Sequence, residues 1–260
     1  IHFLLTFLAL VTTAGVADTL YITLEKDNAL AVVNGETGTL LQTVTLGQRP
    51  RGISLNNDQT LLYVAASDDD TIQIIDVATL KLVGNLPSGE DPETFRIHPN
   101  GQWLYVSNED DNLVSVLDLM NKSVIKQIAV GVEPEGIAVS GDGKWVVNTS
   151  ETSNMVHWID PVDQSIKANT LVDPRPRAAE FSANSDALYV SSEIGGSLSR
   201  INVASKQVDA KVHFTIPGVE KALIQPVGVL VHPNNKLLFV ALGPANRVAV
   251  VDTQTMTVTK

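Results

Sequence analysis

The feature that most constrains this chain is a repeat with a step of 42 residues. Gly89 to Val130 reads as four short apolar stretches separated by turn residues, and the chain copies this pattern. The residues that fall in register are Pro50, Pro92, Pro134 and Pro176, together with Asp76, Asp118, Asp160 and Asn202. One further copy, with Pro226 and Asp252, follows an eight-residue insertion. A repeated four-stranded unit of this length is typical of a β-propeller blade. We therefore predict an all-β fold, a β-propeller of four-stranded antiparallel blades.

We name the strands of a blade a to d, from the inside of the ring outward. Full copies occupy residues 47–88, 89–130, 131–172, 173–224 and 225–260, whereas the copy before residue 47 contains only strands b, c and d. This chain is thus expected to form five full blades plus a partial first blade, and the complete protein six or seven. Propellers commonly complete one blade from both chain ends. The missing strand a is therefore expected after Lys260, which would make 18–260 a C-terminally truncated domain and leave the strand at Tyr21 with an open inner edge.

Local sequence supports this assignment. The a–b turn carries Asp58, Asn100, Asp142, Asn184 and Asn234 at one position. Asn and Asp side chains bond their own backbone and tolerate positive φ, so we place a tight hairpin there. Strand b is apolar at successive residues, as expected for a sheet buried on both faces between neighbouring blades. No helix is predicted.

The N-terminus indicates export. Phe3 to Val16 is an apolar run of the length found in signal peptides, and small residues near Ala17 suit a cleavage site. Residue 1 is Ile and no basic segment precedes the run, so we interpret 1–17 as a truncated secretory signal peptide, with a buried first strand as the alternative. The prediction is a periplasmic or secreted protein with no membrane span after signal removal.

Charge and cysteine content exclude several functions. The net charge of −11 disfavours nucleic acid, because a polyanion would be repelled. The chain has no cysteine, which excludes disulfides, thiolate catalysis and cysteine-ligated metals. We expect a monomer.

Particular motifs resemble known repeats. Tyr105-Val106-Ser107-Asn108, Leu188 to Ser191 and the Gly-x-x-Pro-x-Gly segment at Gly131 resemble the YVTN family of propeller repeats. The apolar start, the run of blades and the loop PGVEKALIQPVGV are similar to the periplasmic propellers associated with PQQ-dependent alcohol catabolism. The first resemblance implies the fold. The second implies an accessory role.

Charged residues sort by blade around the repeated proline. In a propeller the d–a and b–c loops share one face, so their side chains form rings there. The residues before the proline are Arg49, Asp91, Glu133, Arg175 and Gln225, and those after it are Arg51, Glu93, Glu135, Arg177 and Val227. The b–c loops add Glu109, Glu151 and Glu193. The predicted binding site is Arg51, Asp91, Glu93, Glu109, Glu133, Glu135, Glu151, Arg175, Arg177 and Glu193.

Two readings of this site stay open. The loops could be no more than the solvated, charged surface of an acidic protein. Alternatively they could bind a basic protein patch, a cationic small molecule or a hard cation such as calcium, although no metal site is assigned and the sequence requires no cofactor. On either reading the loops are exposed. Charge reversal at Glu93 and Glu135 should then change stability by no more than about 1 kcal/mol. The insertion Phe214 to Lys221 is expected to cover the channel mouth.

Three functions follow. The first is a non-catalytic binding or accessory propeller. The second is a lactonase-type hydrolase with a carboxylate-bound metal, for which an Asn or His complement is missing. The third is a redox propeller that carries its own cofactor. No catalytic residue is assigned, since His98, His157 and His232 fall at turn or strand positions and the three Trp fall on strands.

Overall fold

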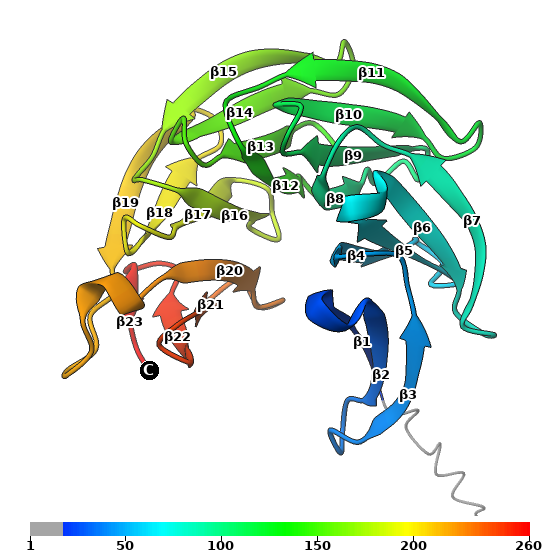
Figure 1. Cartoon of the computed structure of the whole chain (residues 1–260). Helices are drawn as coiled ribbons and strands as arrows, with labels where there is room; N and C mark the ends of the chain where they lie inside the picture. Colours follow the sequence, from blue (N-terminus) through cyan, green and yellow to red (C-terminus); the bar gives the residue numbers. More distant parts are fainter. Residues whose placement is uncertain (1–17) are drawn as a thin grey trace, which may run out of the picture.

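The computed structural model describes residues 18–260 and shows six antiparallel sheets arranged in an arc (Figure 1). The signal-peptide prediction for 1–17 lies outside the described residues. Blade 1 contains β1 (Thr19–Leu24), β2 (Ala29–Asn34) and β3 (Leu40–Thr45). Blade 2 contains β4 (Pro50–Leu55), β5 (Leu61–Ala66), β6 (Thr71–Asp76) and β7 (Lys81–Pro87). Blade 3 contains β8 (Pro92–Ile97), β9 (Trp103–Asn108), β10 (Leu113–Asp118) and β11 (Ser123–Ala129).

The remaining blades follow the same order. Blade 4 contains β12 (Pro134–Val139), β13 (Val146–Ser150), β14 (Met155–Asp160) and β15 (Ser165–Leu171). Blade 5 contains β16 (Pro176–Phe181), β17 (Ala187–Ser192), β18 (Ser197–Asn202) and β19 (Gln207–His213). Blade 6 contains β20 (Pro226–Val231), β21 (Leu237–Leu242), β22 (Arg247–Asp252) and the two-residue β23 (Thr257–Val258). The prediction of five four-stranded blades and one partial blade is confirmed.

The first strand of each four-stranded blade is innermost, and β4, β8, β12, β16 and β20 are successive neighbours around the channel (Figure 1). Blade 1 has the order β1-β2-β3, so the strand at Tyr21 is its inner edge, as predicted. Within residues 18–260 no strand pairs with that edge of β1. Blades 1 and 6 lie at the two ends of the arc (Figure 1).

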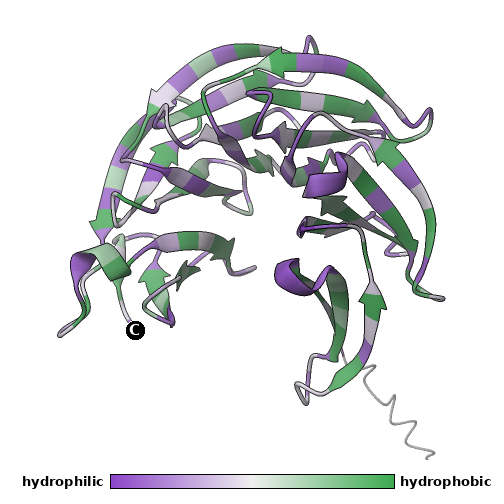
Figure 2. Cartoon of the chain, viewed as in Figure 1, coloured by the Kyte–Doolittle hydropathy of each residue, from purple (hydrophilic) through white to green (hydrophobic). Residues whose placement is uncertain are grey.

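Helical structure in the described residues is limited to three 3₁₀ turns, η1 (Glu25–Asp27), η2 (Ser67–Asp69) and η3 (Lys221–Leu223). Residues 18–260 thus contain no helix that is long and apolar enough to span a membrane. Figure 2 shows η1 and η2 as hydrophilic segments near the inside of the arc.

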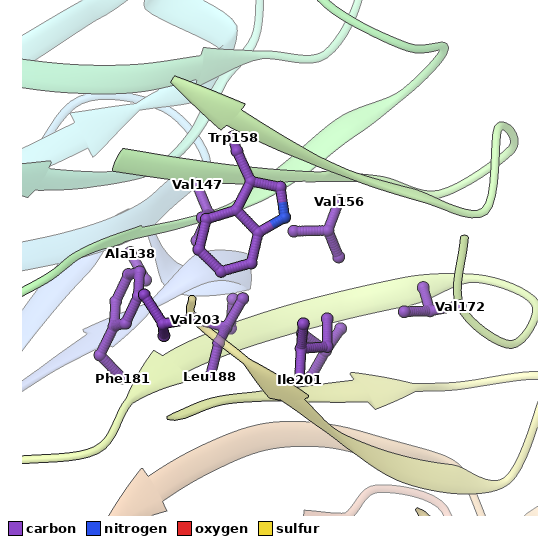
Figure 3. Packing of buried hydrophobic residues seen from close by; sticks show 11 residues of the cluster. Ala138, Val147, Val156, Trp158, Val172, Phe181, Leu188, Ile201 and Val203 are labelled. Carbon is purple, nitrogen blue, oxygen red and sulfur yellow. The ribbon is translucent and has the colours of Figure 1, made fainter. Parts of the chain in front are cut away.

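The core lies between blades. Trp158 of blade 4 is fully buried against Phe181, Leu188 and Ile201 of blade 5 (Figure 3), and its indole N–H donates to Thr170 Oγ1 at 2.9 Å. Burying a side chain of this size contributes about 1.5–3 kcal/mol. Core packing of Trp158 is as predicted, and strand b is nearly continuously buried in blades 2 to 5.

The turns have the predicted chemistry with one shift in position. Asp58 and Asn100 accept backbone N–H groups two residues on, at 3.1 and 3.0 Å. Positive φ occurs one residue later than expected, for example at Gln59 (59°) and Gly101 (70°). At the c–d turn Asp76 accepts the Thr79 N–H at 2.8 Å, which confirms the predicted capping role.

Candidate functional site: the charged mouth of the channel

The d–a and b–c loops meet at one end of the channel, which we call the mouth. The backbone N–H before each of the first four repeat prolines donates to an Asn or Asp of the preceding blade's b–c loop, for example Arg49 to Asn28 Oδ1 at 2.9 Å and Glu133 to Asn112 Oδ1 at 3.0 Å. The carbonyl of the same residue accepts a b–c N–H of its own blade, as Glu133 does from Glu151 at 2.8 Å. These bonds dock each b–c loop against a d–a loop, so the predicted shared face is confirmed.

The same bonds impose an unusual backbone conformation. The residues before the proline have φ in the left-handed region, at 52° for Arg49, 48° for Asp91, 56° for Glu133 and 60° for Arg175. That region costs about 1–2 kcal/mol for a residue with a Cβ. On the inner strand a glycine lets neighbours approach closely, because a Cβ on Gly52 would lie 2.6 Å from the Glu93 carbonyl oxygen. The side chains at the mouth are therefore held on a rigid, closely packed frame.

In one half of the mouth two arginines converge on Glu93. Arg49 Nη2 lies 2.5 Å from Glu93 Oε1, and Arg51 Nη2 lies 2.5 Å from Glu93 Oε2. Arg49 Nη1 also bonds Asp91 Oδ1 at 2.7 Å. Glu25 of blade 1 lies farther away, at 3.7 Å from Arg49 and 3.5 Å from Arg51.

The other half is built around Glu151. Arg177 Nη1 lies 2.6 Å from Glu151 Oε1, and Arg175 Nη2 lies 3.0 Å from Glu151 Oε2. Arg175 Nε reaches Glu193 at 3.0 Å. Glu135 joins the two halves, since its Oε1 lies 3.1 Å from both Arg51 Nη2 and Arg177 Nη2. We call these ion-paired residues the mouth network; it comprises Glu25, Arg49, Arg51, Asp68, Asp91, Glu93, Glu135, Glu151, Arg175, Arg177 and Glu193.

Burial overturns the expectation that this face is fully exposed. Glu93, Glu135 and Glu151 are buried, at 0%, 6% and 2% exposure. Burial and the nearby Glu135 raise the pKa of Glu93 to about 8, against the opposing effect of Arg51. Burial likewise raises the pKa of Glu151 to about 7, opposed by Arg177. The prediction that charge reversal at Glu93 and Glu135 changes stability by no more than about 1 kcal/mol assumed exposed side chains, and that assumption is wrong.

The two predicted residues outside the mouth network, Glu109 and Glu133, lie at its rim and are partly exposed. One carboxylate oxygen from each of Asp91, Glu93 and Glu109 lies within 4.8 Å of the others, the spacing of a potential cation site. Burial raises the pKa of Glu109, with Glu135 and Asp91 adding to the effect. Glu133 accepts a hydrogen bond from Thr152 Oγ1.

The predicted site omitted three members of the mouth network: Asp68, which lies 3.5 Å from Arg49 Nη1, Arg49 itself, and Glu25. Arg49 was seen before the repeat proline but was not assigned to the site, although it contacts Asp91 and Glu93. Glu25 was not recognised at all. Counting back 84 residues from Glu109 through Ser67 reaches Glu25 in the first, partial copy, so the repeat itself contained the signal.

The insertion Phe214 to Lys221 lies on the predicted face of the propeller, but it does not cover the channel mouth as expected. Phe214 N–H donates to the Gly196 carbonyl in a b–c loop at 2.9 Å, and a cavity beside the insertion is lined by Glu193, Ile194 and Lys221. Figure 1 shows η3 and its flanking loop at the outer side of the arc, away from the inner strands. The insertion therefore lies beside the mouth and does not cover it.

Three histidines at strand and turn positions have structural partners. His98 Nε2 lies 2.9 Å from the Gly143 carbonyl oxygen, and His157 accepts the Gly131 N–H at 2.9 Å while Nδ1 lies 2.7 Å from Asn169 Oδ1. His232 Nδ1 accepts the Asn234 N–H at 3.1 Å, at an a–b turn. His157 thus supports the d–a loop that carries Glu133, but none of these three histidines forms an ion pair in the mouth network.

Known proteins support the fold. Residues 56–167 match the family model of the cytochrome D1 heme domain, which is less than half of the chain. Hydrazine synthase of Kuenenia stuttgartiensis is similar over 78% of this chain and 76% of its own, at 22% identity and a TM-score of 0.63. A functionally unknown protein from Desulfotomaculum acetoxidans is similar over 94% of this chain and 78% of its own, at 14% identity and a TM-score of 0.78. The chain matches no curated protein. At these identities the structural likeness shows the β-propeller fold alone.

The heme in the name of the matched family model can be tested against the channel. Iron in such groups is held by His, Met, Cys or Tyr. Within residues 18–260 the side chains that line the central cavities are Arg, Glu, Thr, Ser and apolar residues, and none is of those four types. The residues present therefore do not fit an axially held heme in the channel.

Proposed function

We propose that this chain is a non-catalytic binding propeller, periplasmic or secreted, whose mouth recognises a cationic group on a small molecule or a protein partner. The observation that carries the proposal is the charge of the mouth network, which has seven carboxylates and four arginines. Glu109 and Glu133 add to this excess at the rim. Negative potential focused at a concave opening attracts and orients a cation.

The raised pKa values make the site responsive to such a ligand. With pKa values of about 8 and 7, Glu93 is mostly protonated and Glu151 about half protonated at pH 7, and the other five carboxylates of the network still outnumber its four arginines. A cation in the mouth favours the ionised carboxylates, so its binding should release protons. Rim residues such as Asp91 and Glu109 are partly exposed and can contact a ligand directly.

An accessory role in PQQ-dependent alcohol oxidation is part of this proposal. It is supported by the resemblance of the apolar start, the run of blades and the loop PGVEKALIQPVGV to the periplasmic propellers associated with PQQ-dependent alcohol catabolism. The lactonase alternative has less support, because the group Asp91, Glu93 and Glu109 contains only carboxylates and Arg49 already bonds two of them. The redox alternative is favoured by the family-model match but not by the residues lining the channel.

Calorimetric titration with calcium chloride and with spermidine tests the proposal. We expect one of these cations to bind with an affinity that falls as salt rises, and with a heat that depends on the buffer because protons are released. The double variant D91N/E109Q should weaken binding about tenfold or more, since each lost charge-assisted contact contributes about 1.5 kcal/mol or more.

The matched control changes two carboxylates on the opposite face. Asp58 and Asp142 are exposed in a–b turns, so D58N/D142N should bind both probes as the unchanged protein does. Absence of binding by either cation, or equal weakening in the two double variants, would refute a cation-binding mouth.

A further inference from the structure

Behind the mouth the channel contains an arginine that differs from the others. Arg96 lies on β8, and the corresponding inner-strand residues in the other four-stranded blades are Ser54, Ala138, Glu180 and Leu230. Thus the repeat does not require a charge at this position. Arg96 and Glu180 place opposite charges in two blades that are separated by blade 4.

Arg96 has no close carboxylate partner. Each arginine of the mouth network has a carboxylate oxygen within 3.0 Å, whereas the one carboxylate paired with Arg96 in the described residues, Glu180 Oε2, is 3.9 Å away. Among residues 18–260 its guanidinium makes one hydrogen bond, from Nη1 to the Phe95 carbonyl at 3.0 Å. An arginine has five N–H donors, so most of those of Arg96 are free for a ligand.

The space around Arg96 is sufficient for a small molecule. Three cavities of about 230, 420 and 200 Å³ are all lined by this residue. The first also contains Thr94, Glu135 and Arg177, the second Glu25 and Arg51, and the third Glu180. Arg51 and Arg177 also line the first two cavities but are already ion-paired with Glu93 and Glu151, so Arg96 is the arginine of these cavities that is left for an anion.

We propose that Arg96 binds the carboxylate of a short-chain organic acid inside the channel. A carboxylate matches the planar fork of a guanidinium and can accept two parallel N–H bonds. Two of the volumes at Arg96 lie below the usual range for ligand pockets, about 300–1,000 Å³, and the third lies in its lower part, which suits a small acid. This site prefers the opposite charge from the mouth, so it goes beyond the proposed function.

Glu180 supports the arrangement. Burial raises the pKa of its carboxyl, and Arg96 is the opposing positive charge. The protonated carboxyl can donate a hydrogen bond to a ligand carboxylate, whereas the ionised form repels it. Removal of the negative charge of Glu180 should therefore strengthen binding of the acid at Arg96.

The test is to titrate the protein with succinate and with pyruvate and to detect binding by calorimetry and ligand-observed NMR. Sodium chloride at equal ionic strength is the reference. We expect saturable binding of one of the acids. The variant R96Q should weaken it about tenfold or more, since it removes a bidentate charged contact. E180Q, which retains Arg96, should bind the acid at least as tightly as the unchanged protein.

Controls separate this site from other sources of anion binding. Arg247 is exposed on β22 and also has no carboxylate partner within the described residues, so R247Q should leave succinate and pyruvate binding unchanged. The mouth variant D91N/E109Q should retain it too, which distinguishes failure of this site from failure of the proposed function. If neither acid binds saturably, or if R247Q weakens binding as much as R96Q, the proposal is overturned.

Discussion

The two halves of the mouth contain the same tripeptide, Arg-Pro-Arg, at Arg49 to Arg51 and at Arg175 to Arg177, three repeats apart. Each tripeptide lies between a b–c glutamate of the preceding blade and the inner strand of the following blade. In the second half the arginines turn back and hold Glu151 at 3.0 and 2.6 Å. In the first half the equivalent glutamate, Glu25, is 3.7 and 3.5 Å away and half exposed.

Competition between carboxylates explains the difference. The blade after the first tripeptide offers Asp91 and Glu93, and both arginines reach forward to Glu93 at 2.5 Å. The blade after the second offers Gln225 and Val227, which have no charge at those positions. Arg175 and Arg177 therefore have no forward partner. The choice of partner depends on which blade carries an acid and not on the tripeptide itself.

The strongest test of this comparison is charge reversal at the two closely held glutamates. E93K or E151K replaces a buried carboxylate by a third cation beside two partly buried arginines, so we expect a loss of at least about 3–5 kcal/mol in unfolding free energy, or failure to fold. Denaturant unfolding would measure the loss. E25K, at the loosely held equivalent of Glu151, is the matched control and should cost much less, roughly 1 kcal/mol or under. Equal losses at Glu25 and Glu151 would remove the distinction between the halves.

A double-mutant cycle tests whether the halves are coupled through Glu135. Either Arg51 or Arg177 can pair with Glu135 Oε1, so R51M and R177M should each leave it one cation. The double variant removes both and leaves a buried, unpaired carboxylate. We expect its loss of stability to exceed the sum of the single losses by about 1–3 kcal/mol. Additive losses would show that the halves are independent.

The two halves should also differ in their response to pH. The folded-state pKa values of Glu93 and Glu151, about 8 and 7, lie above the ordinary value of 4.5, so the folded protein binds more protons than the unfolded chain between pH 4.5 and 8. Their contribution to stability is therefore complete below pH 4.5 and is lost as pH rises through 7 and 8. The pKa of Asp142 is lowered, chiefly by its hydrogen bond from Ser140, so its contribution to stability is lost only as pH falls below about 4.

Melting temperatures measured from pH 5 to 9 would separate these contributions. E93Q should flatten the fall from about pH 5 to pH 8, and E151Q should flatten it from about pH 5 to pH 7, so that only E93Q changes the slope between pH 7 and 8. D142N should leave both parts of the curve unchanged. A curve for E93Q that parallels that of the unchanged protein would contradict a raised pKa in the first half.

The fold could be predicted from sequence because each blade repeats local signals. The proline register, the Asx turns and the apolar strand b all report on contacts within a blade or with any neighbouring blade, so one rule holds for every copy. The mouth could be predicted only in part. The repeat placed Glu93, Glu135 and Glu151 on one face, but their burial depends on which residues of other blades lie opposite. That information is in pairs such as Arg51 and Glu135, 84 residues apart, and no single repeat contains it.

The smallest expected effect on stability comes from adding a carboxylate to blade 6 that competes with Glu151 for Arg177. Val227 occupies the position of Glu93 and lines a cavity together with Arg177, so V227E places a carboxylate within reach of that arginine. A new ion pair offsets the cost of burying the charge, and stability should change by about 1 kcal/mol or less. The pKa of Glu151, followed by NMR of its side-chain carboxyl, should rise because Arg177 is drawn away from it. Val248 is exposed on β22, so V248E is the control for an added charge alone. A Glu151 pKa that responds equally to both substitutions would mean that partner choice in the mouth is not set by competition.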